Sequence, residues 1–211
     1  MTETNLRKAN ATIGHIEDSL PEDSSGQITV KEVSSITADP VVDQYPFSGQ
    51  QIIQGTISYV EPSTYTDGRT VSINFELRTD SSLFLTDVAT DSISIESAIS
   101  EFMQATGESI SIYRNLHAAE DALWEFLMTA DRVLEITVLD HGEEVGYTEI
   151  EGIDVDDVIG EFAIENASVG FVEDGNEIFV EYRGGSLQIE TDWPDGREFI
   201  IQTFEKEVLS G

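Results

Sequence analysis

The alternation of apolar and polar residues changes its period along the chain, and each change marks an expected element. From residue 27 the period is two, which is typical of half-buried strands. The alternating runs before residue 90 cover residues 28–30, 53–59 and 71–77. A stretch with Pro62 and Asp67-Gly68 separates the last two runs and favours a hairpin loop. The pattern predicts a β-rich lobe over residues 27–94.

The first residues of the chain show helical spacing instead. The apolar positions are Leu6, Ala9, Ile13, Ile16 and Leu20. A polar stretch that begins at Pro21 would end this element. We therefore expect residues 1–26 to form an N-terminal helix and a linker.

Two further helical stripes occupy the middle of the chain. The first runs from Ile95 to Thr106, with Gly107 as a C-terminal cap. The second runs from Leu116 through Leu123 and Phe126, and Asn115 is a suitable N-cap. Together they predict a central pair of helices.

The period returns to two after the second helix. The candidate strands cover residues 134–138, 161–172, 178–183, 186–191 and 198–203. Asp174-Gly175 and Gly184-Gly185 are hairpin-turn signals, and Trp193 to Gly196 is expected to form a tight turn with a partly buried indole. We predict an α+β fold that is mainly antiparallel β, with a central pair of helices and a C-terminal β-meander. Residues 95–211 form its α+β lobe, either separate from 27–94 or in one domain with it.

The charge of the chain indicates its solvent. The 211 residues include 42 Asp and Glu against 10 Lys and Arg, a formal net charge of −32, and no Cys. Because 39% of the residues are hydrophobic, a folded domain with an acidic surface is expected rather than a disordered tail. This composition resembles that of proteins from salt-accumulating haloarchaea or their viruses. We expect a high-salt cytoplasm or a virion, with hydrated K⁺ or Na⁺ at the surface.

Several function classes lack support in the sequence. Phosphate-binding glycine loops, G-x-S-x-G and H-E-x-x-H do not occur. Because acidic residues far outnumber basic ones, the sequence shows no basic surface for nucleic acid, and we expect no nucleic-acid partner. No apolar run approaches the ~18 residues that a membrane span needs, so we expect no membrane insertion.

Two groups that combine a histidine with carboxylates are candidate ligands for a divalent metal. The groups are His117, Glu120 and Asp121, and Asp140, His141 and Glu143. The first has i, i+3, i+4 spacing on an expected helix, and the second lies at an expected hairpin turn. Acidic neighbours also surround any histidine in so acidic a chain by chance, so we expect no cofactor and keep the metal as an alternative.

The absence of a catalytic motif favours a protein that works by contact. We expect a non-enzymatic structural or interaction protein, such as a virion or other assembly component, that binds a protein partner or a second copy of itself. The expected contact residues are Leu6, Ile13, Ile16 and Trp193. Residues 133–182 lack Lys and Arg. This stretch is either a surface that binds cations or a basic partner, or a set of exposed strands whose acidic residues only reflect adaptation to salt. We favour the second interpretation.

Two alternatives remain open. One is a metal-dependent enzyme that uses His117 and His141 with nearby carboxylates. The other is a small-ligand or oligosaccharide-binding β-rich module that uses Trp193 and the tyrosines.

Overall fold

The chain divides into two compact units in a computed structural model, which describes residues 3–11, 28–61, 68–88, 95–107, 109–150 and 152–210. The N-terminal unit comprises Thr2–Asp39 and Gly49–Leu116, and the C-terminal unit comprises Pro40–Ser48 and His117–Gly211. Strands make up 48% and helices 21%, with antiparallel pairing, which confirms the α+β class. The main division between the two units falls after Leu116.

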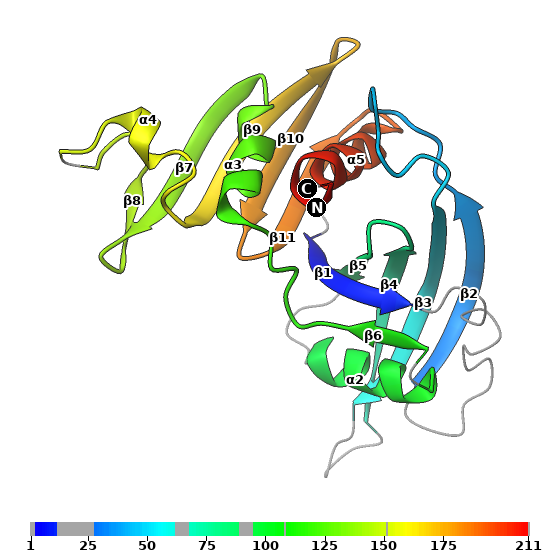
Figure 1. Cartoon of the computed structure of the whole chain (residues 1–211). Coiled ribbons are helices and arrows are strands. Elements are labelled where there is room, and N and C mark those ends of the chain that lie inside the picture. The colour runs from blue at the N-terminus through cyan, green and yellow to red at the C-terminus, as the bar shows by residue number, and fades with distance from the viewer. Residues whose placement is uncertain are drawn as a thin grey trace. The chain divides into compact units, whose positions relative to one another are not determined.

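In its described residues, the N-terminal unit is an antiparallel sheet with one helix, α2 (Figure 1). Its strand order is β2-β3-β4-β5-β1, and β6 also pairs with β1. The elements are β1 Glu3–Ala11, β2 Ile28–Thr37, β3 Gln51–Glu61, β4 Arg69–Arg78, β5 Leu83–Val88, α2 Ile95–Ala105 and β6 Ile110–Ile112. The three alternating runs expected before residue 90 all lie in strands, which confirms those predictions.

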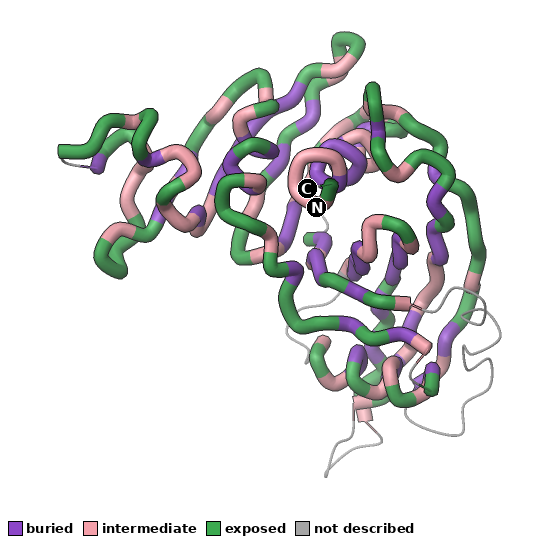
Figure 2. Tube along the Cα trace, in the orientation of Figure 1, coloured by how far each residue is buried: buried purple, intermediate pink, exposed green. Residues whose placement is uncertain are grey.

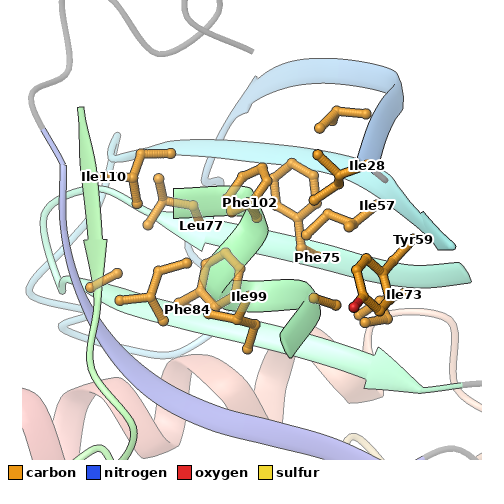
Figure 3. Close-up of a cluster of buried hydrophobic side chains, with 14 of the residues drawn as sticks. Ile28, Ile57, Tyr59, Ile73, Phe75, Leu77, Phe84, Ile99, Phe102 and Ile110 are labelled. Atoms are coloured by element: carbon orange, nitrogen blue, oxygen red, sulfur yellow. The ribbon is translucent and has the colours of Figure 1, made fainter. Parts of the chain in front are cut away.

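Alternate residues of these strands form the core of the unit. Figure 3 shows Ile57, Ile73 and Phe75 on the side of the sheet that faces α2. The Phe102 ring of α2 lies 5.3 Å from the Phe75 ring, measured between centroids. Figure 2 shows the same alternation of buried and exposed positions along the strands. The alternating apolar residues of the strands and the apolar face of α2 therefore pack together in one core.

The predicted N-terminal helix is wrong where the structure describes the segment, because residues 3–11 form strand β1. Leu6 pairs with Leu85 of β5 and is 3% exposed. Arg7 is also buried, and its Nη2 donates to Glu96 Oε1 of α2 at 2.7 Å. Since Arg7 and the buried Thr4 are polar, the strand lacks a visible apolar alternation. Ile13 and Ile16 lie outside the described residues.

The C-terminal unit is a second antiparallel sheet, in the order β11-β10-β9-β7-β8. Its elements are α3 Glu120–Met128, β7 Arg132–Asp140, β8 Glu143–Gly146, α4 Val155–Val158, β9 Ile164–Glu173, β10 Asn176–Arg183, β11 Ser186–Thr191 and α5 Gly196–Leu209. The Phe126 ring of α3 lies 5.9 Å from Phe171 of β9 and 5.2 Å from Phe204 of α5. One face of the sheet is thus covered by helices.

Three expected features of this unit differ from the structure. Helix α3 begins at Glu120 with Ala119 as its N-cap, so Asn115 is not a cap and α3 is shorter than expected. Helix α3 belongs to the C-terminal unit, whereas α2 belongs to the N-terminal unit. The two helices expected as a central pair therefore lie in different units. Of the four strands expected after Gly160, the first three correspond to β9, β10 and β11, but residues 198–203 lie in helix α5.

Helix α5 has a second buried side, which is polar. Gln202 and Glu205 are fully buried, and they bind the segment Pro40–Ser48. Gln202 Oε1 accepts from the backbone N–H of Val41 at 2.8 Å, and the Tyr45 hydroxyl donates to Glu205. These polar residues interrupt the apolar helical period and leave Phe199 to Ile201 as a short apolar run, which sequence patterns cannot distinguish from a strand.

Candidate functional site

A groove of about 390 Å³ lies on the C-terminal unit, where the β9–β10 turn meets the end of β11. Its walls combine aromatic rings with carboxylates. The lining residues are Gly175, Asn176, Glu177, Phe179, Glu190, Thr191, Asp192 and Trp193. We call it the Trp193 groove.

The register of the sheet places the Phe179 ring in this groove. Its neighbours in β10, Ile178 and Val180, are buried, whereas Phe179 points to the opposite face and is 42% exposed. Phe179 pairs with Gly170 on β9 and with Glu190 on β11. A Cβ atom at Gly170 would lie 3.9 Å from the edge of the Phe179 ring. This distance is an ordinary van der Waals contact, so the Phe179 ring lies close to Gly170 of the neighbouring strand.

Trp193 is fixed by the tight turn between β11 and α5. Its backbone N–H donates to Thr191 Oγ1 at 3.1 Å, and its backbone carbonyl accepts from the Gly196 N–H at 3.0 Å. Its ring lies 5.8 Å from the Phe199 ring of α5. The indole is half-buried, so the predicted turn and partly buried indole are both confirmed. The ring is held in place from the helix side and contributes to the groove wall.

Three carboxylates give the groove a negative charge. Glu190 stands beside Phe179 across the strands, and extending the same register by one step brings Asp192 opposite Glu177. Arg132 Nη1 lies 3.4 Å from Glu177 Oε1, and both side chains are more than half exposed. Within the described residues, the carboxylates of Glu190 and Asp192 have no ion pair or hydrogen bond. The groove therefore retains two carboxylates that are free to bind a cation.

The structure does not bring the candidate metal ligands together. His117 is exposed and precedes α3 with a φ of 54°, so it does not share a helix face with Glu120 and Asp121 as expected. Asp140 Oδ1 and His141 Nδ1 are 2.6 Å apart, but the His141 side chain is 92% exposed. Glu143 follows at the start of β8. No group of three or more His, Asp or Glu among the described residues is arranged to hold a metal ion.

The clear pKa shifts of Glu96 and Tyr182 arise outside the groove. A hydrogen bond from Arg7 lowers the pKa of Glu96. Burial raises the pKa of Tyr182, a residue of the helix-covered face of β10. The groove itself contains neither of these two groups.

Of the expected partner contacts, the structure places Trp193 at a groove and Leu6 inside the N-terminal unit. The sequence reasoning missed Phe179 and the carboxylates around it. A usable signal was present: Phe179 occupies a polar position in an alternating strand, between Glu177 and Glu181. A large aromatic residue on the solvent side of a strand often marks a contact surface.

Comparison of the sequence with protein-family models and with curated proteins gave no match. Among the described residues, no helix has the length and apolar character to cross a bilayer.

Proposed function

We propose that this is a non-enzymatic interaction protein of a salt-adapted archaeon or its virus, and that it binds a protein partner or a second copy of itself through the Trp193 groove. The groove is the observation that supports this proposal. It places Phe179 and Trp193 on the surface beside carboxylates. Exposed aromatic residues in a shaped depression are typical anchors of protein interfaces.

The charge of the chain supports the same proposal. A net charge of −32 disfavours nucleic acid and favours partners that carry basic side chains. In concentrated salt the long-range part of this attraction is screened, because the Debye length falls to ~3 Å at 1 M. Recognition would then depend on direct contacts within the groove, which the two aromatic rings provide. A cytoplasm rich in KCl or a virion is the corresponding proposed setting.

The test compares the wild type with Phe179→Ser/Trp193→Ala, a change confined to partly exposed side chains. Self-association is measured by light scattering after size exclusion in about 3 M KCl, where repulsion is screened. Partner binding is measured on an array of random peptides in the same salt. We expect either self-association or peptide binding, and we expect the double variant to lose it.

Val172→Ser is the matched control, because Val172 lies on the same sheet face and is 38% exposed but does not line the groove. It should behave as the wild type. A monomer that binds no peptide, or binding that the double variant retains, would contradict the proposal. A stabilising shift with Zn²⁺ or Mn²⁺ that His117→Ala and His141→Ala abolish would favour the metal-enzyme alternative instead.

A further inference from the structure

We infer that the Trp193 groove binds a guanidinium group, the side chain of an arginine presented by the protein partner. This inference rests on the proposed function and names the chemistry of the occupant. It rests on the ring faces, the geometry of the carboxylates and a guanidinium contact already present in the chain.

The arrangement of the groove suits a flat cation. Phe179 and Glu190 are direct cross-strand neighbours, and such neighbours have Cβ atoms ~5 Å apart. Trp193 and Asp192 are adjacent along the chain at the same end of the sheet. A planar cation can therefore lie against an aromatic ring while its edge N–H groups donate to a carboxylate.

One carboxylate of the groove already binds a guanidinium. Arg132 lies 3.4 Å from Glu177 on the exposed sheet face. Glu190 and Asp192 have no such cation among the described residues, although they line the same groove. A second guanidinium from outside the chain would repeat at these two residues the contact that Arg132 makes with Glu177.

Arginine fits this groove better than lysine. A guanidinium is planar, stacks on aromatic faces and is more weakly hydrated than an ammonium group, so its transfer from concentrated salt into the groove costs less. An ammonium ion is compact and strongly hydrated, and it cannot bind a carboxylate with two parallel N–H groups. We therefore expect the groove to discriminate between the two cations rather than bind any positive charge.

The direct test uses a ¹⁵N-labelled protein in 2 M KCl and follows the two indole N–H signals, since the chain has two Trp. Trp193→Phe assigns the Trp193 signal, and the buried Trp124 signal is the internal reference. The probes are N-ethylguanidinium, its neutral isostere N-ethylurea, and propylammonium. We expect only N-ethylguanidinium to shift the Trp193 signal saturably, with an affinity at least about tenfold above that of the other two.

The charge variants locate the contact. Glu190→Gln and Asp192→Asn should each weaken N-ethylguanidinium binding by about threefold or more. Glu181→Gln is the matched control, because Glu181 is an exposed acid of the neighbouring strand β10 that does not line the groove. Equal loss in all three variants would mean a general charge effect and would overturn the inference.

The outcomes also separate this inference from the proposed function. If array peptides bind at the groove and replacing their arginines by citrulline leaves binding unchanged, the guanidinium inference fails and the proposed function stands. If the protein neither self-associates nor binds a peptide through the groove, and N-ethylguanidinium does not shift the Trp193 signal, both fail. A Trp193 shift with oligosaccharides but not with N-ethylguanidinium would also overturn the inference, in favour of sugar binding.

Discussion

At the scale of single residues, buried polar side chains make specific contacts between elements of this fold. Arg7 is buried on strand β1, and its guanidinium donates to Glu96 Oε1 at 2.7 Å and to Oε2 at 3.3 Å. This two-bond geometry fixes the position of α2 against β1. It also explains why the N-terminal strand was hidden in the sequence: its inward positions include an arginine.

The Arg7–Glu96 pair predicts a pH dependence. The pKa of Glu96 is lowered from 4.5 in the folded protein. The stabilisation is therefore fully present above about pH 4.5, the unfolded value, and is lost as the pH falls through the lower folded pKa. The difference in free energy of unfolding between wild type and Glu96→Gln should be constant above that pH and shrink below it. Urea unfolding between pH 3 and 7 measures this difference.

Glu125→Gln is the control for that series, since Glu125 is an exposed acid of α3. A difference for Glu96→Gln that does not change with pH would contradict the pairing. The Glu96 side chain is 49% exposed, so the effect should also weaken as salt rises.

Gly196 offers a second prediction at this scale. A Cβ atom there would lie 2.6 Å from Thr191 Cγ2 and 2.8 Å from Thr191 Oγ1, so Thr191 must move. We expect Gly196→Ala to destabilise the protein by about 1–3 kcal/mol, as overpacking does. Adding Thr191→Ser, which removes Cγ2, should restore part of the loss. Gly170→Ala, whose new Cβ meets only ordinary contacts, should cost less; equal costs in urea unfolding would refute the steric explanation.

At the scale of elements, the sequence predicted those whose buried face is apolar. Strand β4 buries Val71, Ile73 and Phe75 at alternate positions, and the strand was found. Helix α5 buries Gln202 and Glu205 against Pro40–Ser48, and it was predicted as a strand. The difference is physical: a long-range hydrogen bond can replace apolar contact at a buried position, and no local pattern reveals that.

Helix α3 supplies the prediction for this scale. Phe126 is fully buried between Phe171 and Phe204, and Leu123 is 4% exposed on the same helix. We expect Phe126→Ala or Leu123→Ala to reduce the free energy of unfolding by about 2–5 kcal/mol. Denaturant unfolding in molar KCl measures it, with the exposed Glu125→Ala as control. Costs below about 0.5 kcal/mol for both would show that this face is not core.

At the scale of the whole molecule, the net charge of −32 predicts that stability depends on salt. With 42 acidic residues against 10 basic ones, removal of salt restores repulsion over the surface. Circular dichroism should show loss of native structure as KCl is dialysed from about 3 M to 50 mM. Mild acidification should partly replace salt by neutralising carboxylates. Full stability at neutral pH in 50 mM KCl would contradict this prediction.

The candidate site was only partly accessible from the sequence. Trp193 was identified because it stands in a Pro-Asp-Gly turn, which is a local signal. Its partners in the groove come from β10 and from the register between β10 and β11, so they depend on pairing. The group of His117, Glu120 and Asp121 was proposed from helical spacing, which the left-handed φ of His117 breaks.

The contact between Pro40–Ser48 and α5 also limits when the C-terminal unit can fold during synthesis on the ribosome. Val41 precedes Gln202, the residue to which it donates, by 161 positions. A ribosome that adds ~5–20 residues per second needs roughly 8–30 s to cover that distance. During this interval Tyr45 has been made but its Glu205 acceptor has not. The C-terminal unit therefore cannot close before α5 emerges, and a gene fragment that begins at residue 117 would encode a unit without the segment that covers its last helix.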